Sequence, residues 1–427
     1  MILLGLIFVV FLIFGVPVSF AVGLLSFGGV LLFTDIPTVD VFSSMLLGLC
    51  NPLLLAVPFF ILAANLMNAG TATDRLIDVC SSLVGHKKGG LAYVNILVSM
   101  IFAGITGSSQ EDTVSVGRNL IPAMENQGYD KGTAVGVTAA SSTIGCVIPP
   151  SVTMVVYAAI AGVDTDAMFV TGILPGLLMG IFMMFVVGIF TKPKKFPGGE
   201  KADVEKVKHS IMESLPALLT PLILIGGIIS GWYTPVEAAV FACLYALIIG
   251  LFFYDTIKVR DLPQIFSNTM KAAALPLFAL ATANSMRLLV AYYHLDTALA
   301  SVFSGMAGGK IWFLLAVEAA FLLIGMFMDA VPAIIMFVPL LLPAAAVLGI
   351  SPLILGLVTV ITLALGLVTP PYGPCLLIAS GISGISMDKA FKGVRPYLIS
   401  SIAVLVLLAL FSDVFLAVPK LFFPALF

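Results

Sequence analysis

The chain has 427 residues, of which 60% are hydrophobic and 10% are charged, and its formal net charge at pH 7 is −2. A mean hydropathy of +1.17 excludes an ordinary soluble domain, and many apolar runs reach the roughly 20 residues that a helix needs to span a bilayer. The long apolar runs therefore predict an all-α polytopic membrane protein in a lipid bilayer. The sequence shows no basic face with interleaved aromatic residues, so we expect no nucleic-acid partner.

The first half of the chain, residues 1–191, is organised by its apolar runs and their polar interruptions. A polar tip, ITGSSQEDT, lies within residues 91–126, which are too many for one span at 1.5 Å per residue across about 30 Å. We therefore expect a re-entrant hairpin, tolerated only inside protein or a watery cavity. In chain order, the predicted elements are scaffold helices over 1–70, an arm over 71–85, the hairpin over 91–126, a broken helix over 132–163 and a helix over 167–191.

A polar segment, KPKKFPGGEKADVEKVKH, follows the first half and contains six lysines and one histidine. The positive-inside rule assigns it to the cytoplasm, so residues 192–211 are expected to form a cytoplasmic loop. The second half then follows the same plan as the first. Its predicted elements, within 212–427, are scaffold helices over 212–292, an arm over 294–306, a hairpin over 311–346, a broken helix over 352–386 and a helix over 393–417.

The start of one scaffold helix is predicted in detail by Thr234-Pro235-Val236-Glu237. Threonine is a favoured N-cap, proline suits the first helical position, and a glutamate three residues after the cap completes a capping box. We therefore assign Glu237 a structural role.

Glycines and prolines recur in the two halves in the same order. These residues fix backbone shape, so ordered matches indicate a repeated fold. If the hairpins turn back, each half makes an odd number of full crossings, and the halves are then inverted copies, as in many secondary transporters. The matched positions include Gly104 with Gly325, Pro122 with Pro343, Gly128 with Gly349, Thr138 with Thr359, Gly145 with Gly366, and Pro149-Pro150 with Pro370-Pro371.

Each predicted broken helix carries a Pro-Pro pair shortly after a glycine. Proline cannot donate to a helix and clashes with the preceding turn, so the pair forces an unwound gap. The gap frees carbonyl groups, which suit a monovalent cation, and N–H groups at a helix N-terminus, which suit an anion. A kink that only shapes packing explains a single pair, but two pairs at matching positions beside polar tips favour ion sites.

The tips and gaps predict two cation sites with room for an organic anion between them. The first cation site is expected to use Ser108, Ser109, Thr143 and the Gly145 backbone. The second is expected to use Gly325, Asp329, Gly366 and Thr369. The anion is expected to contact Ser151 and Tyr372.

Charged residues inside the apolar runs are few. Asp329 is a membrane-embedded acid, and such residues are functional by default, so we assign it a cation role. Glu111 and Asp112 follow the first tip, where acids complement the helix dipole, with a ligand role as the alternative. Arg287 is expected to snorkel to the outer interface, with a substrate carboxylate as the alternative partner. The sequence does not place Glu318.

Five motifs are specific in combination: VPFFILAANLM (57–67), GITGSSQEDT (104–113), IPPSVTMVVYA (148–158), GWYTPVEAA (231–239) and GLVTPPYGPCLL (366–377). Together they resemble the large membrane (permease) subunit of the TRAP, or tripartite ATP-independent periplasmic, transporters. The resemblance covers essentially the whole chain. One departure is that many relatives have small neutral residues where this chain has Gln110-Glu111-Asp112.

The resemblance implies a sodium-coupled importer in a bacterial inner membrane, with at least two Na⁺ ions. It implies a small four-helix membrane subunit and a periplasmic substrate-binding protein as partners, and an organic anion such as sialic acid or a C4-dicarboxylate as substrate. The implied fold is similar to elevator transporters, in which hairpins and broken helices move against a scaffold.

The family's ion sites correspond here to Ser108-Ser109 with 145–150, which includes Pro149, and to 325–329, which includes Met328, with 366–371. The substrate contacts implied beside them are Ser109, Pro150, Ser151, Pro371, Tyr372 and Gly373.

Other classes of protein fit the sequence less well. A passive channel needs a polar face along several spans, and these spans are nearly free of charge. An intramembrane serine enzyme using Gly107-Ser108 needs an embedded base, whereas His86, His209 and His294 fall at loops or interfaces. The sequence has no nucleotide-binding motif, which argues against a transporter that is driven by its own ATP hydrolysis. We therefore expect a transporter and not an enzyme, with a channel or a non-TRAP anion transporter as the alternatives.

Overall fold

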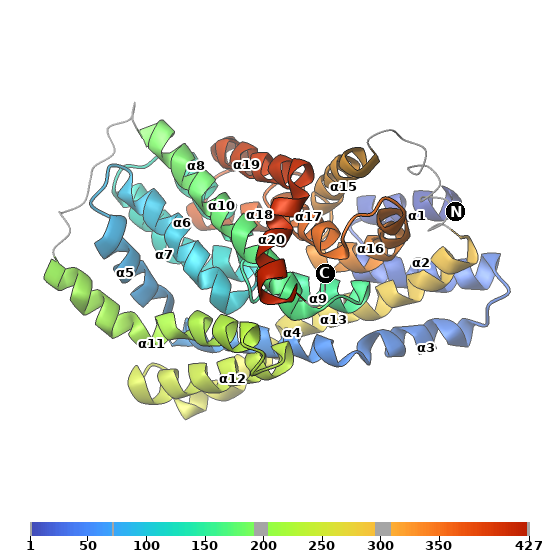
Figure 1. Ribbon diagram of the computed structural model, residues 1–427, viewed down its shortest axis with the longest axis horizontal. Helices are drawn as coiled ribbons and strands as arrows, with labels where there is room; N and C mark the ends of the chain where they lie inside the picture. Colours follow the sequence, from blue (N-terminus) through green and yellow to red (C-terminus); the bar gives the residue numbers. More distant parts are fainter. Residues whose placement is uncertain (1, 71, 192–203, 295–308, 425–427) are drawn as a thin grey trace.

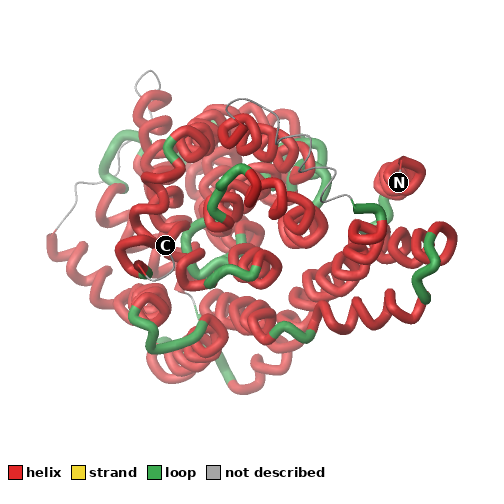
Figure 2. Tube along the Cα trace, turned by 45° about the vertical axis from the view of Figure 1, so that its right-hand side comes forward, coloured by secondary structure: helices red, strands yellow, loops and turns green. Residues whose placement is uncertain are grey.

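The computed structural model describes residues 2–70, 72–191, 204–294 and 309–424. Every regular element in those ranges is a helix, and seven helical segments there are long and apolar enough to cross a membrane. The all-helical, multi-pass membrane class predicted from hydropathy is therefore confirmed. Figure 2 shows that only short loops interrupt the helices of the described chain.

The first half forms α1 (Ile2–Ile13), α2 (Val18–Phe33), α3 (Thr38–Leu49), η1 (Pro52–Leu55), α4 (Ala56–Ala69), α5 (Ala72–Val84), α6 (Gly90–Thr106), α7 (Ser109–Asn126), α8 (Lys131–Ser142), η2 (Thr143–Cys146), α9 (Val152–Ala161) and α10 (Thr165–Thr191). The range of the first hairpin thus holds α6 and α7, and that of the first broken helix holds α8, η2 and α9.

The second half forms α11 (Val204–Ile229), α12 (Pro235–Ile248), the π-helical turn η3 (Ile249–Phe253), η4 (Val259–Asp261), α13 (Leu262–Tyr292), α15 (Gly309–Gly325), α16 (Ala330–Val347), α17 (Pro352–Gly366), α18 (Pro374–Ser383), α19 (Met387–Leu410) and α20 (Ser412–Phe422). The arm expected over 294–306 lies, apart from His294, outside the described residues.

Two sequence-based boundaries need correction. The cytoplasmic loop expected over 192–211 is wrong for its last residues, because α11 begins at Val204. Lysine and glutamate are good helix formers, so their charge marks a membrane border without ending the helix. The helix expected over 393–417 is two helices, because α19 ends at Leu410 and α20 begins at Ser412.

The capping box that starts α12 is confirmed. The Thr234 N–H donates to Glu237 Oε2 over 2.8 Å, and the Glu237 N–H donates to Thr234 Oγ1 over 3.3 Å. Pro235 occupies the first helical position. Each side chain therefore accepts from a backbone N–H that the first turn of α12 leaves without a helical partner, as the local sequence indicates.

Helices of the two halves interleave instead of forming two separate bundles. Helix α2 packs against α13, and α4 packs against α12. Around the helix breaks, α7 packs against α18, and α9 packs against α16. Each hairpin therefore contacts the broken helix of the other half, and α9, α17 and α18 lie near the middle of the molecule (Figure 1).

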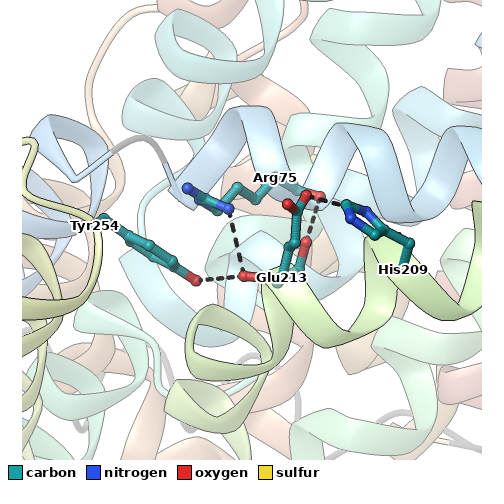
Figure 3. Close-up of polar contacts among 5 residues, drawn as sticks. Arg75, His209, Glu213 and Tyr254 are labelled. Carbon is teal, nitrogen blue, oxygen red and sulfur yellow. Dashed lines mark hydrogen bonds and ion pairs between the residues drawn. The ribbon is translucent and has the colours of Figure 1, made fainter.

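Helix α5, in the range predicted as an arm, is fixed to α11 by a polar joint (Figure 3). The Arg75 guanidinium stands 3.9 Å from the centroid of the Tyr254 ring. Arg75 Nη1 and the Tyr254 hydroxyl both donate to the Glu213 carbonyl, over 3.5 and 3.1 Å. The Ser214 hydroxyl donates to the Arg75 carbonyl over 3.0 Å, and His209 Nδ1 lies 3.5 Å from Glu213 Oε2. The start of α5 is thereby tied to α11.

Candidate functional site

The tip of the first hairpin docks on the first helix break. Gly107 ends α6 with a φ of +61°, and a Cβ there would lie 2.5 Å from the Pro150 carbonyl oxygen, so only glycine fits. Ser108 is the N-cap of α7. The Val152 N–H donates to the Gly107 carbonyl over 3.3 Å. The Ser109 hydroxyl donates to Cys146 Sγ over 3.0 Å, which joins α7 to the break.

The first break itself is buried and held together by hydroxyl groups. Ser151 Oγ donates to the Cys146 carbonyl over 2.6 Å, and Thr153 Oγ1 donates to the same oxygen over 3.3 Å. Ser151 also accepts from the Met154 N–H over 3.3 Å, which caps α9. The Pro149-Pro150 bond is cis. The side chains at the break therefore take up backbone groups that the missing helical turn leaves free.

The predicted ligands of the first cation site lie close together. Ser109 Oγ also lies 3.4 Å from the Thr143 carbonyl oxygen. A Cβ on Gly145 would lie 3.2 Å from the Ser108 carbonyl carbon and oxygen. The Thr143 hydroxyl donates to the Ala140 carbonyl over 2.7 Å, so its backbone oxygen is the one directed to the tip. Carbonyl and hydroxyl oxygens of this kind suit a hard cation.

The second tip and break meet through two glycines. A Cβ on Gly366 would lie 2.5 Å from the Gly325 Cα, so both positions need glycine. The Tyr372 N–H donates to the Met326 carbonyl over 3.1 Å, and the Thr369 N–H donates to the Gly366 carbonyl over 3.0 Å. The Pro370-Pro371 bond is also cis. Gly325, Gly366 and Thr369 are therefore neighbours, as the second predicted site requires.

Asp329 connects the two tips. Its Oδ1 accepts from the Ala330 N–H over 2.8 Å, which caps α16, and its Oδ2 accepts from Gln110 Nε2 over 3.1 Å. Gln110 belongs to the first turn of α7, so one hydrogen bond joins hairpin to hairpin. Local sequence offers no signal for a bond between residues this far apart.

A cavity of about 470 Å³ lies between the tips. Both hairpins, both breaks and helices α4 and α13 contribute to its wall. Its polar lining is Asn65, Asn68, Ser108, Ser109, Gln110, Glu111, Ser115, Thr153, Lys271 and Asp329. Sequence reasoning missed Asn65, Asn68 and Lys271, because each lies within or at the edge of an apolar run that reads as scaffold.

Lys271 is the single cation among the described residues of that wall, against the acids Glu111 and Asp329. Its side chain is exposed, and its ammonium group forms no hydrogen bond or ion pair with the described residues. A free ammonium in a cavity attracts an anion. The wall therefore carries one group that attracts an anion and two that attract cations.

A second cavity of about 430 Å³ adjoins the first and shares Asp329 with it. Met328 and Tyr372 line this second cavity, together with residues 15–19. Met328 is buried, and the Tyr372 side chain is 50% exposed. Asp329 therefore stands at the boundary between the two spaces.

The predicted substrate contacts are divided among several places. Ser109 lines the first cavity and Tyr372 the second, whereas Ser151 is fully buried and bonded within the break. Pro150 is buried with Ser151, and Pro371 is exposed beside Tyr372. Gly373 is buried and is the N-cap of α18. Their roles toward a substrate stay predictions.

The remaining acids separate into different environments. Glu111 lines the first cavity, whereas Asp112 is fully buried on the other side of α7, with hydroxyls of Ser142 and Ser99 facing it. Glu318 is buried in α15, 8% exposed. Arg287 is exposed and donates to Asn284 Oδ1 over 3.4 Å, in keeping with a surface position.

Comparison with known proteins gives consistent matches over most of the chain. The family profile of the "Tripartite ATP-independent periplasmic transporter, DctM component" matches residues 5–414. A putative TRAP transporter large permease protein of Haemophilus influenzae is 35% identical, with 91% of each chain covered. The sialic acid TRAP transporter large permease protein SiaM of Vibrio cholerae is 34% identical, over 98% of this chain and 97% of its own.

A third permease and one solved structure also match this chain. The C4-dicarboxylate TRAP transporter large permease protein DctM of Pseudomonas aeruginosa is 33% identical, with 86% of each chain covered. Among solved structures, the YdaH transporter of Alcanivorax borkumensis superposes with a TM-score of 0.59 at 14% identity, over 88% of this chain and 89% of its own. The fold is thus similar to a transporter fold that persists at low sequence identity.

Proposed function

This chain belongs to the family of the DctM component of tripartite ATP-independent periplasmic transporters, and from that premise we propose that it imports an organic anion across a bacterial inner membrane, driven by sodium. The family is one of transporter permeases, not enzymes. The observation that carries the proposal is the cavity between the two tips, where both helix breaks, the free Lys271 and the acid Asp329 meet.

The substrate is a carboxylate. Lys271 supplies a positive charge that no described protein group neutralises. The amides of Asn65 and Asn68 offer donors and acceptors for hydroxyl or carbonyl groups on the same wall. The relatives named as a sialic acid permease and a C4-dicarboxylate permease support this class. The proposal covers both and leaves the choice to the measurement below.

Sodium occupies both tips in this proposal, so at least two ions accompany each substrate. At the first tip the donors are the backbone oxygens around Gly145 and the hydroxyls of Ser108 and Ser109. At the second they come from the Gly325–Gly366 contact, Thr369 and Asp329. These donors fit the ion, because carbonyl, hydroxyl and carboxylate oxygens are hard ligands.

Sodium binding explains why only the loaded protein crosses. An unsatisfied polar group in hydrocarbon costs several kcal/mol, so an empty tip opposes movement through the bilayer. Ions at the tips, and an anion between them, satisfy the exposed carbonyls and the charge of Asp329. We assign the moving unit to the hairpins and broken helices, and the scaffold to α2, α4, α12 and α13, as inverted repeats in an elevator mechanism.

The partners follow from the tripartite family. A small four-helix membrane subunit completes the membrane part, and a periplasmic binding protein delivers the substrate. The alternative function, a passive channel for anions, differs in one measurable respect. A channel equilibrates the substrate and cannot concentrate it.

The test uses vesicles that contain this chain with its small subunit, the periplasmic protein, and sialic acid or succinate as the probe. An imposed sodium gradient should accumulate one probe above equilibrium, and Asp329→Asn should weaken the sodium dependence. Asp388→Asn is the matched control, since Asp388 is exposed at the start of α19. Accumulation without any sodium requirement, or mere equilibration, would contradict the proposal.

A further inference from the structure

Three buried oxygen-bearing side chains of the second half have atoms without hydrogen-bond partners in the described structure. They are Glu318 Oε1 on α15, and Thr359 Oγ1 and Thr362 Oγ1 on α17. Glu318 is 8% exposed, and the two threonines are fully buried. Buried polar atoms are nearly always satisfied. An unpaired carboxylate is especially costly inside a membrane, so these atoms call for a partner.

The helix geometry brings Glu318 and Thr359 to the same seam. Helices α15 and α17 pack against each other, and their C-terminal ends touch, because a Cβ on Gly325 would lie 3.0 Å from the Gly366 Cα. Glu318 precedes Gly325, and Thr359 precedes Gly366, by seven residues, about two turns and 10 Å along the axis. Seven residues return a side chain nearly to the same face. Glu318 and Thr359 are therefore both placed at the interface between α15 and α17, at the same distance from the Gly325–Gly366 contact.

Thr362 lies one turn from Gly366 on the flank of the same face. The seam between α15 and α17 thus carries a carboxylate and two hydroxyls. None of the three unpaired oxygens bonds to another of them. Hydrogen bonds within the cluster therefore do not satisfy these three oxygens. A cation that they coordinate together would satisfy them.

The corresponding seam of the first half, between α6 and α8, carries a chain of hydrogen-bonded amide and hydroxyl groups. Asn95 Nδ2 donates to Thr138 Oγ1 over 2.6 Å, and Ser141 Oγ donates to Asn95 Oδ1 over 3.1 Å. The hydroxyls of Ser99 and Ser141 lie 3.1 Å apart. Thr138 matches Thr359 in the repeat pattern, yet Thr138 belongs to a closed amide–hydroxyl chain. The carboxylate nearest to that chain is Asp112 of α7, which faces the Ser99 hydroxyl, whereas in the second half the carboxylate belongs to α15 itself.

We propose that the α15–α17 seam is a monovalent cation site, in which Glu318 supplies the charge and Thr359 and Thr362 supply neutral oxygens. It lies about two helical turns from the Gly325–Gly366 contact, toward the N-termini of both helices, and is separate from the ion sites at the tips. The proposal deepens the sodium-coupled function above and rests on it. Occupancy neutralises Glu318, so the ion removes the cost of an embedded charge when the hairpin crosses the bilayer.

The experiment compares Glu318→Gln with the wild-type complex, reconstituted with its small subunit. Half-saturating sodium is measured in uptake, and sodium-dependent thermal stabilisation is measured in detergent against choline. We expect about a tenfold rise in half-saturating sodium, because the amide keeps the shape and loses the charge. The gain in Tm from sodium should shrink in parallel. Thr359→Val with Thr362→Val provides a second variant, with a smaller change in the same direction.

Thr138→Val is the matched control, because it opens the neutral network of the first half and should lower stability without changing the sodium dependence. A wild-type complex without sodium dependence would refute the proposed function itself. Sodium-dependent wild type with an unchanged Glu318→Gln variant would overturn only this site. A Glu318→Gln variant that loses pH dependence while keeping its sodium dependence would also overturn it, in favour of a proton.

Discussion

The two helix breaks occupy matching positions in the chain and are built differently. The first, between η2 and α9, is buried throughout, and the hydroxyls of Ser151 and Thr153 bind the Cys146 carbonyl. The second, between α17 and α18, exposes Pro371 and Tyr372. It is held by the backbone contact of Gly325 with Gly366 and by a bond from the Tyr372 N–H to the Met326 carbonyl.

The difference teaches that one sequence device can be stabilised in two ways. A Pro-Pro pair opens a helix in both halves, but side-chain hydroxyls help to close the first gap, together with the close approach of Gly107 to Pro150, whereas backbone contacts close the second. A gap closed by hydroxyls is sensitive to losing an oxygen atom. A gap closed by glycines is sensitive to gaining a carbon atom.

The largest effect is expected from Gly366→Ala. Its Cβ would lie 2.5 Å from the Gly325 Cα, and backbone on both sides must shift, at a cost of about 1–3 kcal/mol or more. Gly145→Ala should cost less, since its nearest contacts are 3.2 Å away. Thermal unfolding measures both, with Gly381→Ala as the open-space control. Equal losses at the two breaks would abolish the contrast.

Ser151→Ala should rank second. It removes the cap of α9 and the donor to the Cys146 carbonyl, together about 1–2 kcal/mol. Thr369→Val, at the second break, removes only a hydroxyl that bonds back within α17, to the Leu365 carbonyl over 2.8 Å, and should cost less than 1 kcal/mol or so. Unfolding in denaturant compares them, and a larger loss from Thr369→Val would contradict the hydroxyl account.

Gln110→Leu tests the bond that links the two regions. The substitution leaves Asp329 Oδ2 without its cross-tip donor, but Asp329 lines the cavity, where a water molecule can take the place of the lost donor. We expect a several-fold weaker sodium affinity in uptake, with little change in Tm. Gln110→Asn keeps the amide on a shorter arm and should be intermediate. If Gln110→Leu kept the wild-type sodium affinity, the hydrogen bond from Gln110 to Asp329 would not contribute to sodium binding.

The smallest effect on stability is expected from Tyr372→Phe. The ring is 50% exposed, and its hydroxyl forms no hydrogen bond with the described residues, so unfolding should change by less than about 0.5 kcal/mol. Any change should appear in the KM for the transported anion instead. A marked loss of Tm would mean that the second break depends on this side chain after all.

Local chemistry made much of the site predictable. Gly145 and Gly366 beside the Pro-Pro pairs predict interrupted helices, because glycine and proline act on the backbone itself. Ser109 follows from its place at a polar tip inside an apolar run. These signals need no knowledge of the tertiary fold.

Other parts of the site depend on packing that no local pattern encodes. The bond from Gln110 to Asp329 joins residues 219 positions apart. Lys271 reads as the border of an apolar run, but α13 begins at Leu262 and carries it well inside the helix. The charged start of α11 reads as a loop in the sequence, because charge indicates a membrane border and does not show where a helix begins.

Helix α5 also constrains how force passes through the molecule. It is bonded to α11 at Arg75 and to α7 through Asn119, whose amide donates to Asp74. Both contacts come from adjacent residues near the start of this 13-residue helix, so that end of α5 links the first hairpin to α11. Gly89, with a φ of +76°, is the N-cap of α6, and a displacement of the first hairpin relative to α11 should first strain the contacts at Asp74 and Arg75.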